Sequence, residues 1–259
     1  MTPIGICVGF EDLPEAHRLG YDFVEISLAQ LNALPEYDFL ELAEYIDGTG
    51  ISVRACYDML PENMRITGPG VSAQSQHEYL NGAFFRASRL GVKIIAMDCA
   101  VNRHVSDEND FPAAWRQLGN FMRLVQGHAA NTGLRIAVEP IRKSECNILN
   151  LVSEATLMAG LMQLDNVGVL PNTGSMAMAS EPLSALRRAM PLIMHVHLEG
   201  ALRKGLPAPG DGESYDKIFR MLSQLGYIGG VSIRGRHTSD FSAEAKTALE
   251  YLRIAQAQF

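Results

Sequence analysis

The segment Leu192-Ile193-Met194-His195-Val196-His197-Leu198-Glu199-Gly200 changes character in its middle. It begins with apolar residues, carries two histidines at alternate positions, and runs into a polar stretch rich in glycine and proline. Such a run is typical of a buried strand that is followed by a loop. Because side chains alternate along a strand, His195 and His197 should point to the same side. A histidine at a strand end is either a hydrogen-bonded core residue or part of a site, and this segment alone leaves both interpretations open.

Seven further apolar runs occur along the chain, and a stretch with helical spacing of apolar residues follows each of the eight. The predicted strands cover 4–8, 23–27, 52–57, 93–98, 135–139, 167–172, 193–198 and 230–234. The predicted helices cover 13–19, 37–48, 74–90, 112–131, 151–161, 183–188, 215–225 and 243–257. This alternation is typical of parallel strands joined by crossover helices. Without a glycine-rich phosphate-binding fingerprint, eight such units predict an α/β protein with a closed (β/α)8 barrel rather than an open doubly wound sheet.

The composition agrees with one barrel domain covering residues 1–259, since single barrels run to about 250 residues. Hydrophobic residues make up 47% of the chain, which is enough for a large core. The net charge of −7 and the lack of a basic run argue against nucleic acid or an anionic membrane as partners. We expect a cytoplasmic protein with reduced thiols, because the sequence shows no leader or membrane span and its four cysteines form no CxxC pair.

In such barrels the chemistry takes place on loops that leave the carboxyl ends of the strands. Polar residues stand at the expected ends of strands four to eight: Asp98 with Arg103 and His104 in its loop, Glu139, Asn172 with Ser175, His197, and Arg234 with Arg236. The segment 58–70, rich in proline and glycine, is a candidate lid over this end. No GxSxG, Walker A or GxGxxG motif supports serine-hydrolase or nucleotide chemistry.

Short motifs follow one another in a recognisable order over nearly the whole chain: Leu90-Gly91-Val92, Ala137-Val138-Glu139-Pro140, Val167-Gly168-Val169-Leu170, His195-Val196-His197, Arg203 with Pro209-Gly210-Asp211-Gly212, and Leu225-Gly226-Tyr227-Ile228-Gly229-Gly230-Val231-Ser232-Ile233. In this order and spacing the chain resembles the xylose-isomerase-like superfamily of sugar isomerases and epimerases, especially its branch of ketose 3-epimerases and hydroxypyruvate isomerases. The resemblance is specific for the superfamily and not for a substrate.

The resemblance implies a metal site. Members of the family typically hold one divalent ion with Glu, Asp, His and Glu from the ends of strands five to eight, while two carboxylates move a proton between neighbouring carbons. Glu139 and His197 match the first and third ligands. Arg203 matches an arginine that contacts substrate, and Glu145 matches a second carboxylate that contacts substrate.

Three positions depart from the family pattern. The family's Asp is Asn172 here, a nearby His is Ser175, and the final Glu is Arg234. A divalent cation about 4 Å from an arginine would be repelled by roughly 8 kcal/mol at an effective dielectric of about 20. Arginine also cannot lose its proton to become a ligand or a base.

We therefore expect no cofactor, with Arg234 taking the place of the cation within about 4 Å of Glu139. The alternative is that Arg234 points into solvent. If Mn, Mg, Co or Zn binds after all, the resemblance implies Glu139 and His197 as its ligands. We also expect His197 to serve the site more than the stability of the fold.

Two hypotheses about function follow. In the first, the chain is an isomerase or epimerase acting on a small sugar, sugar acid or sugar phosphate without a metal. Glu139 or Glu145 would be the base, and Arg234, Arg203 and His197 would stabilise an enediolate-like intermediate. In the second, it is a catalytically inactive relative that binds a carbohydrate-like ligand or serves as a partner subunit.

The expected arginines of the mouth favour an anionic, sugar-like ligand; they are Arg103, Arg203, Arg234 and Arg236. For Arg103 and Arg236 the alternative is a solvated charge at the rim. Asn172 and Ser175 complete the expected substrate-binding residues. A homo-oligomer is expected by analogy with the family only.

Overall fold

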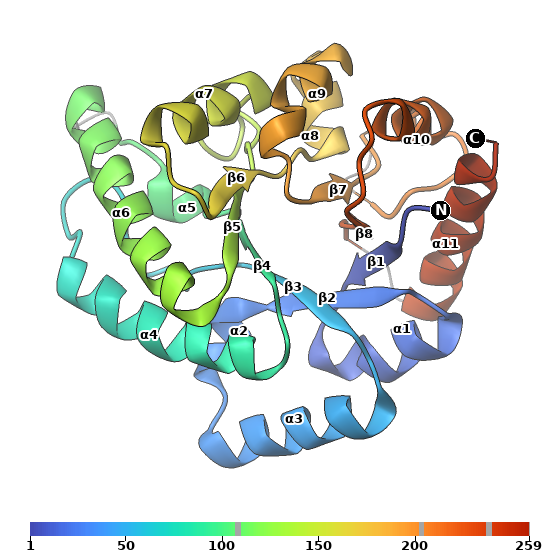
Figure 1. Cartoon of the computed structure of the whole chain (residues 1–259), viewed down its shortest axis with the longest axis horizontal. Helices are drawn as coiled ribbons and strands as arrows, with labels where there is room; N and C mark the ends of the chain where they lie inside the picture. The colour runs from blue at the N-terminus through green and yellow to red at the C-terminus, as the bar shows by residue number, and fades with distance from the viewer. Residues whose placement is uncertain (107–109, 202–204, 237–239, 259) are drawn as a thin grey trace.

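The computed structural model describes residues 1–106, 110–201, 205–236 and 240–258 (Figure 1). In these ranges eight parallel strands form one curved sheet in the order β6-β5-β4-β3-β2-β1-β8-β7. They are β1 (Ile4–Cys7), β2 (Phe23–Ser27), β3 (Val53–Tyr57), β4 (Ile94–Met97), β5 (Arg135–Val138), β6 (Val167–Val169), β7 (Val196–Leu198) and β8 (Val231–Ile233). Isolated parallel bridges pair Val169 with Ile193 and Asn172 with His197, and so join β6 to β7. The sheet closes on itself, and the predicted (β/α)8 barrel is confirmed.

The helices lie outside the ring of strands (Figure 1). They are α1 (Leu13–Leu19), α2 (Leu28–Ala33), α3 (Glu36–Thr49), α4 (Ala73–Arg89), α5 (Ala100–Arg103), α6 (Phe111–Thr132), α7 (Val152–Met162), α8 (Thr173–Met178), α9 (Ser184–Ala189), α10 (Tyr215–Gln224) and α11 (Phe241–Gln256), with short 3-10 turns at η1 (Phe10–Asp12) and η2 (Met190–Leu192). The sequence does not predict α2, α5 and α8, whose six residues or fewer give little room for an apolar period, whereas the equally short α9 is predicted at 183–188. Of the helices described, none combines the length and the apolar character that crossing a bilayer requires.

Strand β6 is shorter than predicted, and the reason bears on the site. The sequence predicts a strand to residue 172, but β6 ends at Val169. Pro171 has no N–H for the ladder, and Asn172 already caps α8 with its side chain. The early end of the strand therefore places Asn172 at the mouth of the barrel as a helix cap.

The core has two parts. A large apolar cluster packs the helices against the sheet, and a small second cluster consists of Ala55, Ile94, Ala96, Ala137 and Leu170. In the sheet, the ring of Phe23 occupies the space that the missing side chain of Gly5 leaves open. A Cβ on Gly5 of β1 would lie 2.3 Å from the ring of Phe23, so only glycine admits that ring.

The candidate lid, segment 58–70, is packed down in this structure. Asn102 Nδ2 donates to the carbonyl oxygens of Pro61 at 2.8 Å and Met64 at 2.7 Å. Arg65 donates to the carbonyl oxygens of Val101 at 2.7 Å and His104 at 2.8 Å. A lid made of this segment would have to break these bonds in order to open.

Candidate active site

The expected site residues meet around one carboxylate at the carboxyl end of the barrel. Glu139 follows β5 and is 2% exposed. Asn172 Nδ2 donates to Glu139 Oε1 at 2.8 Å, and His197 Nδ1 lies 3.1 Å from Glu139 Oε2. Arg234 Nη1 lies 3.9 Å from the same Oε2. The expected convergence of these four side chains is confirmed, and so is the distance expected between Arg234 and Glu139.

The amide of Asn172 is oriented by the helix that it caps. Its Oδ1 accepts a hydrogen bond from the backbone N–H of Ser175 at 3.0 Å. With the oxygen engaged at the N-terminus of α8, the Nδ2 group faces Glu139. Ser175 is buried and lines the cavity above the site.

His197 lies between two carboxylates and has no exposed surface. Its Nε2 is 3.2 Å from Glu25 Oε2, on the side opposite Glu139. Burial alone would lower the pKa of His197, but Glu139 and Glu25 together raise it well above its usual value. The imidazole is therefore charged at neutral pH, and both of its nitrogens donate.

Glu25 continues this buried chain of charges. His195 Nε2 lies 2.5 Å from Glu25 Oε1 and 2.9 Å from Ser232 Oγ. Burial would raise the pKa of Glu25, but His195 and His197 outweigh it and hold that pKa well below the usual range. The sequence reasoning did not single out Glu25, although an acid in the middle of the buried strand Phe23–Ser27 is a signal that could have found it.

Arg234 leaves β8 and reaches the mouth, with 26% of its side chain exposed. Its Nη2 lies 2.8 Å from Asp98 Oδ2 and 3.7 Å from Asp58 Oδ1. The guanidinium lies over the ring of Tyr57, 5.2 Å from its centroid. Three carboxylates and an aromatic face thus hold one cation at the floor of the mouth.

Two adjoining cavities, of about 560 and 680 Å³, open above this floor. Both are lined by Asp58, Glu145, Glu199, Arg234 and Arg236. Of the expected substrate-binding residues, Glu145 and Arg236 are exposed on these walls, while Asn172 and Ser175 line the deeper cavity. Arg203 lies outside the described residues.

Arg103 does not lie at the rim. It is completely buried, and its guanidinium donates to the carbonyl oxygens of Met97, Glu139 and Leu149 at 3.1, 2.7 and 3.4 Å. Neither the expected place among the arginines of the mouth nor the alternative of a solvated rim charge agrees with this burial, because a buried guanidinium needs acceptors and finds them at the ends of β4 and β5. Arg103 braces the backbone under Glu139 and is absent from the lining of either cavity.

An ion pair that the sequence reasoning missed completes the cavity. Arg142 Nη2 pairs with Glu199 Oε2, and both side chains are about nine-tenths buried. Among the described residues, Arg142 Nη1 has no hydrogen-bond acceptor, although it is buried. Arg142 lies in the irregular loop after β5, where no periodic pattern marks it.

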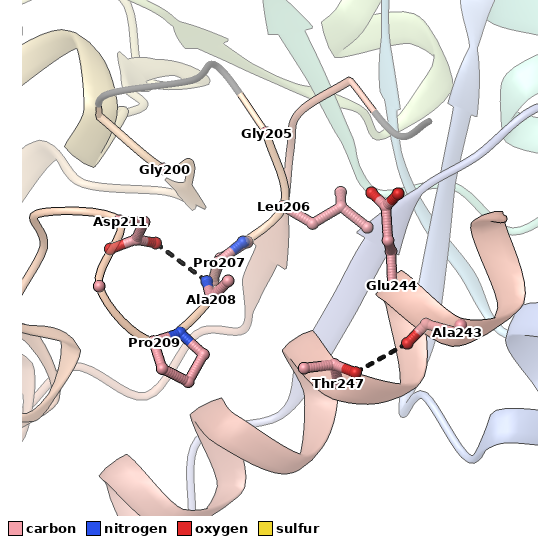
Figure 2. A pocket seen from close by; sticks show the side chains of 11 residues that line it. Gly200, Gly205, Leu206, Pro207, Ala208, Pro209, Asp211, Ala243, Glu244 and Thr247 are labelled. Atoms are coloured by element: carbon pink, nitrogen blue, oxygen red, sulfur yellow. Dashed lines mark hydrogen bonds between the residues drawn. The ribbon is translucent and has the colours of Figure 1, made fainter. Parts of the chain in front are cut away.

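The motif Pro209-Gly210-Asp211-Gly212 stabilises the loop in which it lies through local hydrogen bonds of Asp211. Asp211 accepts hydrogen bonds from the backbone of Ala208 at 3.0 Å and Glu213 at 2.9 Å, and from the Tyr215 hydroxyl at 2.6 Å. Figure 2 shows Asp211 turned toward Ala208 at the edge of a separate hollow of about 410 Å³ against α11. The motif therefore shapes the loop after β7.

The family resemblance implies a divalent metal at Glu139, and the residues present do not fit one. Asn172 offers Nδ2 instead of an oxygen, and Arg234 brings a cation to 3.9 Å from the carboxylate. Both His197 nitrogens face carboxylates, so no lone pair is available for a ligand bond.

A second group of potential ligand atoms, on Cys7, Glu25 and His197, lies within 4.8 Å. Burial and the charge of Glu25 raise the pKa of the Cys7 thiol to about 12, so the thiolate that a metal needs is disfavoured. His197 is already engaged on both sides here as well. This group does not fit a divalent ion either.

Comparison with known proteins agrees with the fold. A family model described as a xylose isomerase-like TIM barrel matches residues 13–255. A solved D-psicose 3-epimerase of Clostridium cellulolyticum H10 with D-tagatose has a TM-score of 0.85, 18% identity, and coverage of 99% of each chain. An L-ribulose 3-epimerase has a TM-score of 0.85 and 21% identity, covering 100% of this chain and 95% of that one.

The 3-keto-D-glucoside 4-epimerase of E. coli is similar as well, with a TM-score of 0.85, 18% identity, and coverage of 98% of this chain and 100% of that one. At such identities the solved structures show a shared fold. No curated protein sequence matches this chain significantly. The family model, however, spans all but the ends of the sequence. The chain belongs to the xylose isomerase-like TIM-barrel family.

Proposed function

We propose that this protein is an isomerase or epimerase of a small sugar, sugar acid or sugar phosphate, and that it moves a proton next to a carbonyl without a divalent metal. The observation that carries the proposal is the position of Arg234. Its guanidinium stands where the family pattern has a metal ligand, at the floor of a cavity large enough for a small ligand.

Arg234 is suited to hold a developing negative charge. Its Nη2 is engaged by Asp98, and its Nη1 is buried without a hydrogen bond to any described residue, while about a quarter of the side chain is exposed. A cation about 3 Å from an enediolate oxygen gains roughly 5 kcal/mol at an effective dielectric of about 20. A preorganised donor of this kind lowers the barrier to removing a proton beside a carbonyl.

The deeper residues support Arg234. Glu139 interacts with Asn172, His197 and Arg234, and it thereby fixes the positions of these three side chains relative to one another. Burial would raise the pKa of Glu139, but His197 and Arg234 lower it to about 2, so it stays ionised. We assign substrate binding to Glu145, Arg236, Ser175 and, from the resemblance, Arg203.

One observation favours the alternative, a catalytically inactive relative that binds a carbohydrate-like ligand or serves as a partner subunit. Both oxygens of Glu139 are engaged, and a carboxylate with a pKa of about 2 is a weak base at neutral pH. If no other carboxylate takes over that role, the family's proton transfer is lost.

Hydrogen–deuterium exchange discriminates the two. The purified protein, treated with EDTA and checked for metal content, is incubated in D2O with ketoses, aldoses and keto acids, and deuterium incorporation is followed by NMR. We expect exchange that persists in EDTA, gains nothing from added Mn²⁺, and falls at least 100-fold in Arg234→Met. Exchange that requires added metal would contradict the metal-free mechanism, and binding without exchange would favour the inactive relative.

The cellular setting follows from the same reasoning. The net charge of −7 favours a small-molecule ligand over nucleic acid. A cytoplasmic location and a homo-oligomer remain predictions, which cell fractionation and light scattering would check.

A further inference from the structure

Asp58 holds a central place in the mouth. It directly follows β3, and it is one of the residues that line both adjoining cavities. About half of its side chain is exposed, and its Oδ1 lies 3.7 Å from Arg234 Nη2. A ligand bound against Arg234 therefore meets Asp58 as well.

The backbone presents Asp58 in an unusual conformation. Its φ of +46° lies in the left-handed region, which residues other than glycine seldom adopt. Its N–H donates to Asp98 Oδ2 at 2.9 Å, and the N–H of Met59 donates to Asp98 Oδ1 at 3.2 Å. Such conformations persist where the surroundings enforce them, and they cluster at functional sites.

The other carboxylates near Arg234 are already engaged. Glu139 accepts from Asn172 and His197, and Glu199 is paired with Arg142. Asp98 accepts two backbone N–H groups in addition to Arg234. Asp58 also has a side-chain hydrogen bond with Ser27, but about half of its side chain is exposed at the cavity and its closest described cation lies at 3.7 Å.

The protonation of Asp58 also suits proton transfer at neutral pH. The groups that face it, from the ends of β4, β8, β5, β2 and β3, are Asp98, Arg234, Glu139, Ser27 and Tyr57. Burial and the charge of Asp98 raise the pKa of Asp58 to about 6, against the opposing effect of Arg234. Both forms of the carboxyl group are then accessible near neutral pH, which general acid–base catalysis requires.

We infer that Asp58 is the catalytic residue that takes and returns the proton, on an α-hydroxycarbonyl substrate whose carbonyl oxygen is bound by the partly exposed guanidinium of Arg234. This inference rests on the proposed function and deepens it. It assigns the base to a residue outside the positions that match the family's metal site.

The reaction balances with these two groups. The Asp58 carboxylate removes the proton from the hydroxyl-bearing carbon, the C–H electrons form the carbon–carbon double bond, and the carbonyl electrons move to the oxygen beside Arg234. The hydroxyl proton passes between the two enediolate oxygens, and protonated Asp58 returns its proton to the former carbonyl carbon. One carboxylate works on one face of the substrate, so the geometry favours aldose–ketose isomerisation; inversion of a carbon needs a second group on the opposite face.

The test compares Asp58→Asn with Asp47→Asn, an exposed acid on α3 that lines neither cavity. The probes are glyceraldehyde, D-fructose and hydroxypyruvate in D2O, and circular dichroism and melting curves check that each variant folds. We expect Asp58→Asn to lower the exchange rate at least 100-fold, Asp58→Glu to retain part of it, and Asp47→Asn to match the wild type. The wild-type rate should rise with pH through about 6, because the carboxylate form is the base.

The outcomes separate the two levels of the argument. If the wild type exchanges protons and folded Asp58→Asn does so at the same rate, the assignment of Asp58 is overturned while the proposed function stands. If the wild type exchanges no proton with any probe, the proposed function fails and the role of Asp58 fails with it. A product inverted at one carbon, with no isomerised carbonyl, would contradict the one-sided transfer.

Discussion

The inside of the barrel and its mouth both hold dense charge, but they are built differently. Inside, Glu139, His197, Glu25 and His195 form an unbroken chain of contacts with almost no exposed surface. At the mouth, Arg234 and Asp58 are partly exposed, their closest atoms are 3.7 Å apart, and Arg234 Nη1 makes no hydrogen bond to any described residue. The fully paired layer is suited to hold geometry, and the partly paired layer is suited to bind a ligand.

The largest effect should come from breaking the buried layer at Glu25. Glu25→Ala leaves two histidines facing a vacated position, and loss of one partner of a buried ion pair costs about 3 to 5 kcal/mol of unfolding free energy. The exposed Glu44→Ala on α3 is the control and should change stability by less than about 0.5 kcal/mol. Urea denaturation measures both. Similar midpoints for the two variants would show that the buried chain contributes little.

The same layer should make stability depend on pH on the acid side. Because the pKa of folded Glu139 is lowered from 4.5 to about 2, its contribution is complete above 4.5 and is lost as the pH falls through about 2. The free energy linked to that change is roughly 3 kcal/mol. His197 has the opposite sign, since its pKa is raised: its contribution is complete below about 6.5 and is lost only as the pH rises through its higher folded value.

Denaturation curves at a series of pH values would check this. Stability should be greatest between about pH 4.5 and 6.5 as far as these two groups are concerned. Glu139→Gln should flatten the decline between pH 4.5 and 2, and an unchanged decline in that variant would assign it to other carboxylates.

Two arginines that the sequence reasoning treated alike should behave differently. Arg103→Met leaves three backbone carbonyls without their donor in a buried site, which should cost about 2 to 3 kcal/mol of stability. Arg236→Met removes an exposed charge at the cavity rim and should change stability by less than about 0.5 kcal/mol. Melting temperatures distinguish the two, and a stable Arg103→Met protein would argue against its bracing role.

These contrasts show which features of the fold and the site can be predicted from the sequence. The sequence predicts the eight strands and the barrel, because the periodicity of apolar residues is a local feature. It also predicts that Glu139, Asn172, His197 and Arg234 meet, because the carboxyl ends of the strands share one end of the barrel. The partners of each charge could not be predicted, because they come from distant strands. Arg103 and Arg236 both follow strand ends, yet only the folded chain shows that one points to carbonyls and the other to the cavity. The same holds for His197, expected to serve the site, whose complete burial between two acids also gives it a part in stability.

The smallest effect, and the sharpest test of the mouth, concerns the metal that these residues do not fit. Asn172→Asp combined with Arg234→Glu replaces an amide and a cation by two carboxylates beside Glu139 and His197. The change removes the repulsion of a divalent ion and leaves oxygen ligands in its place, so His197 can release a proton and coordinate. We expect the double variant to bind Mn²⁺ or Co²⁺ at least tenfold more tightly than the wild type, as measured by calorimetry, which is equivalent to about 1.4 kcal/mol.

The control variant, Asn172→Asp with Arg236→Glu, changes the net charge by the same amount but leaves Arg234 in place. It should bind metal no better than the wild type. Equal metal affinity in the two double variants would mean that Arg234 does not exclude the ion, and the view of this arginine as a replacement for the metal would have to be abandoned.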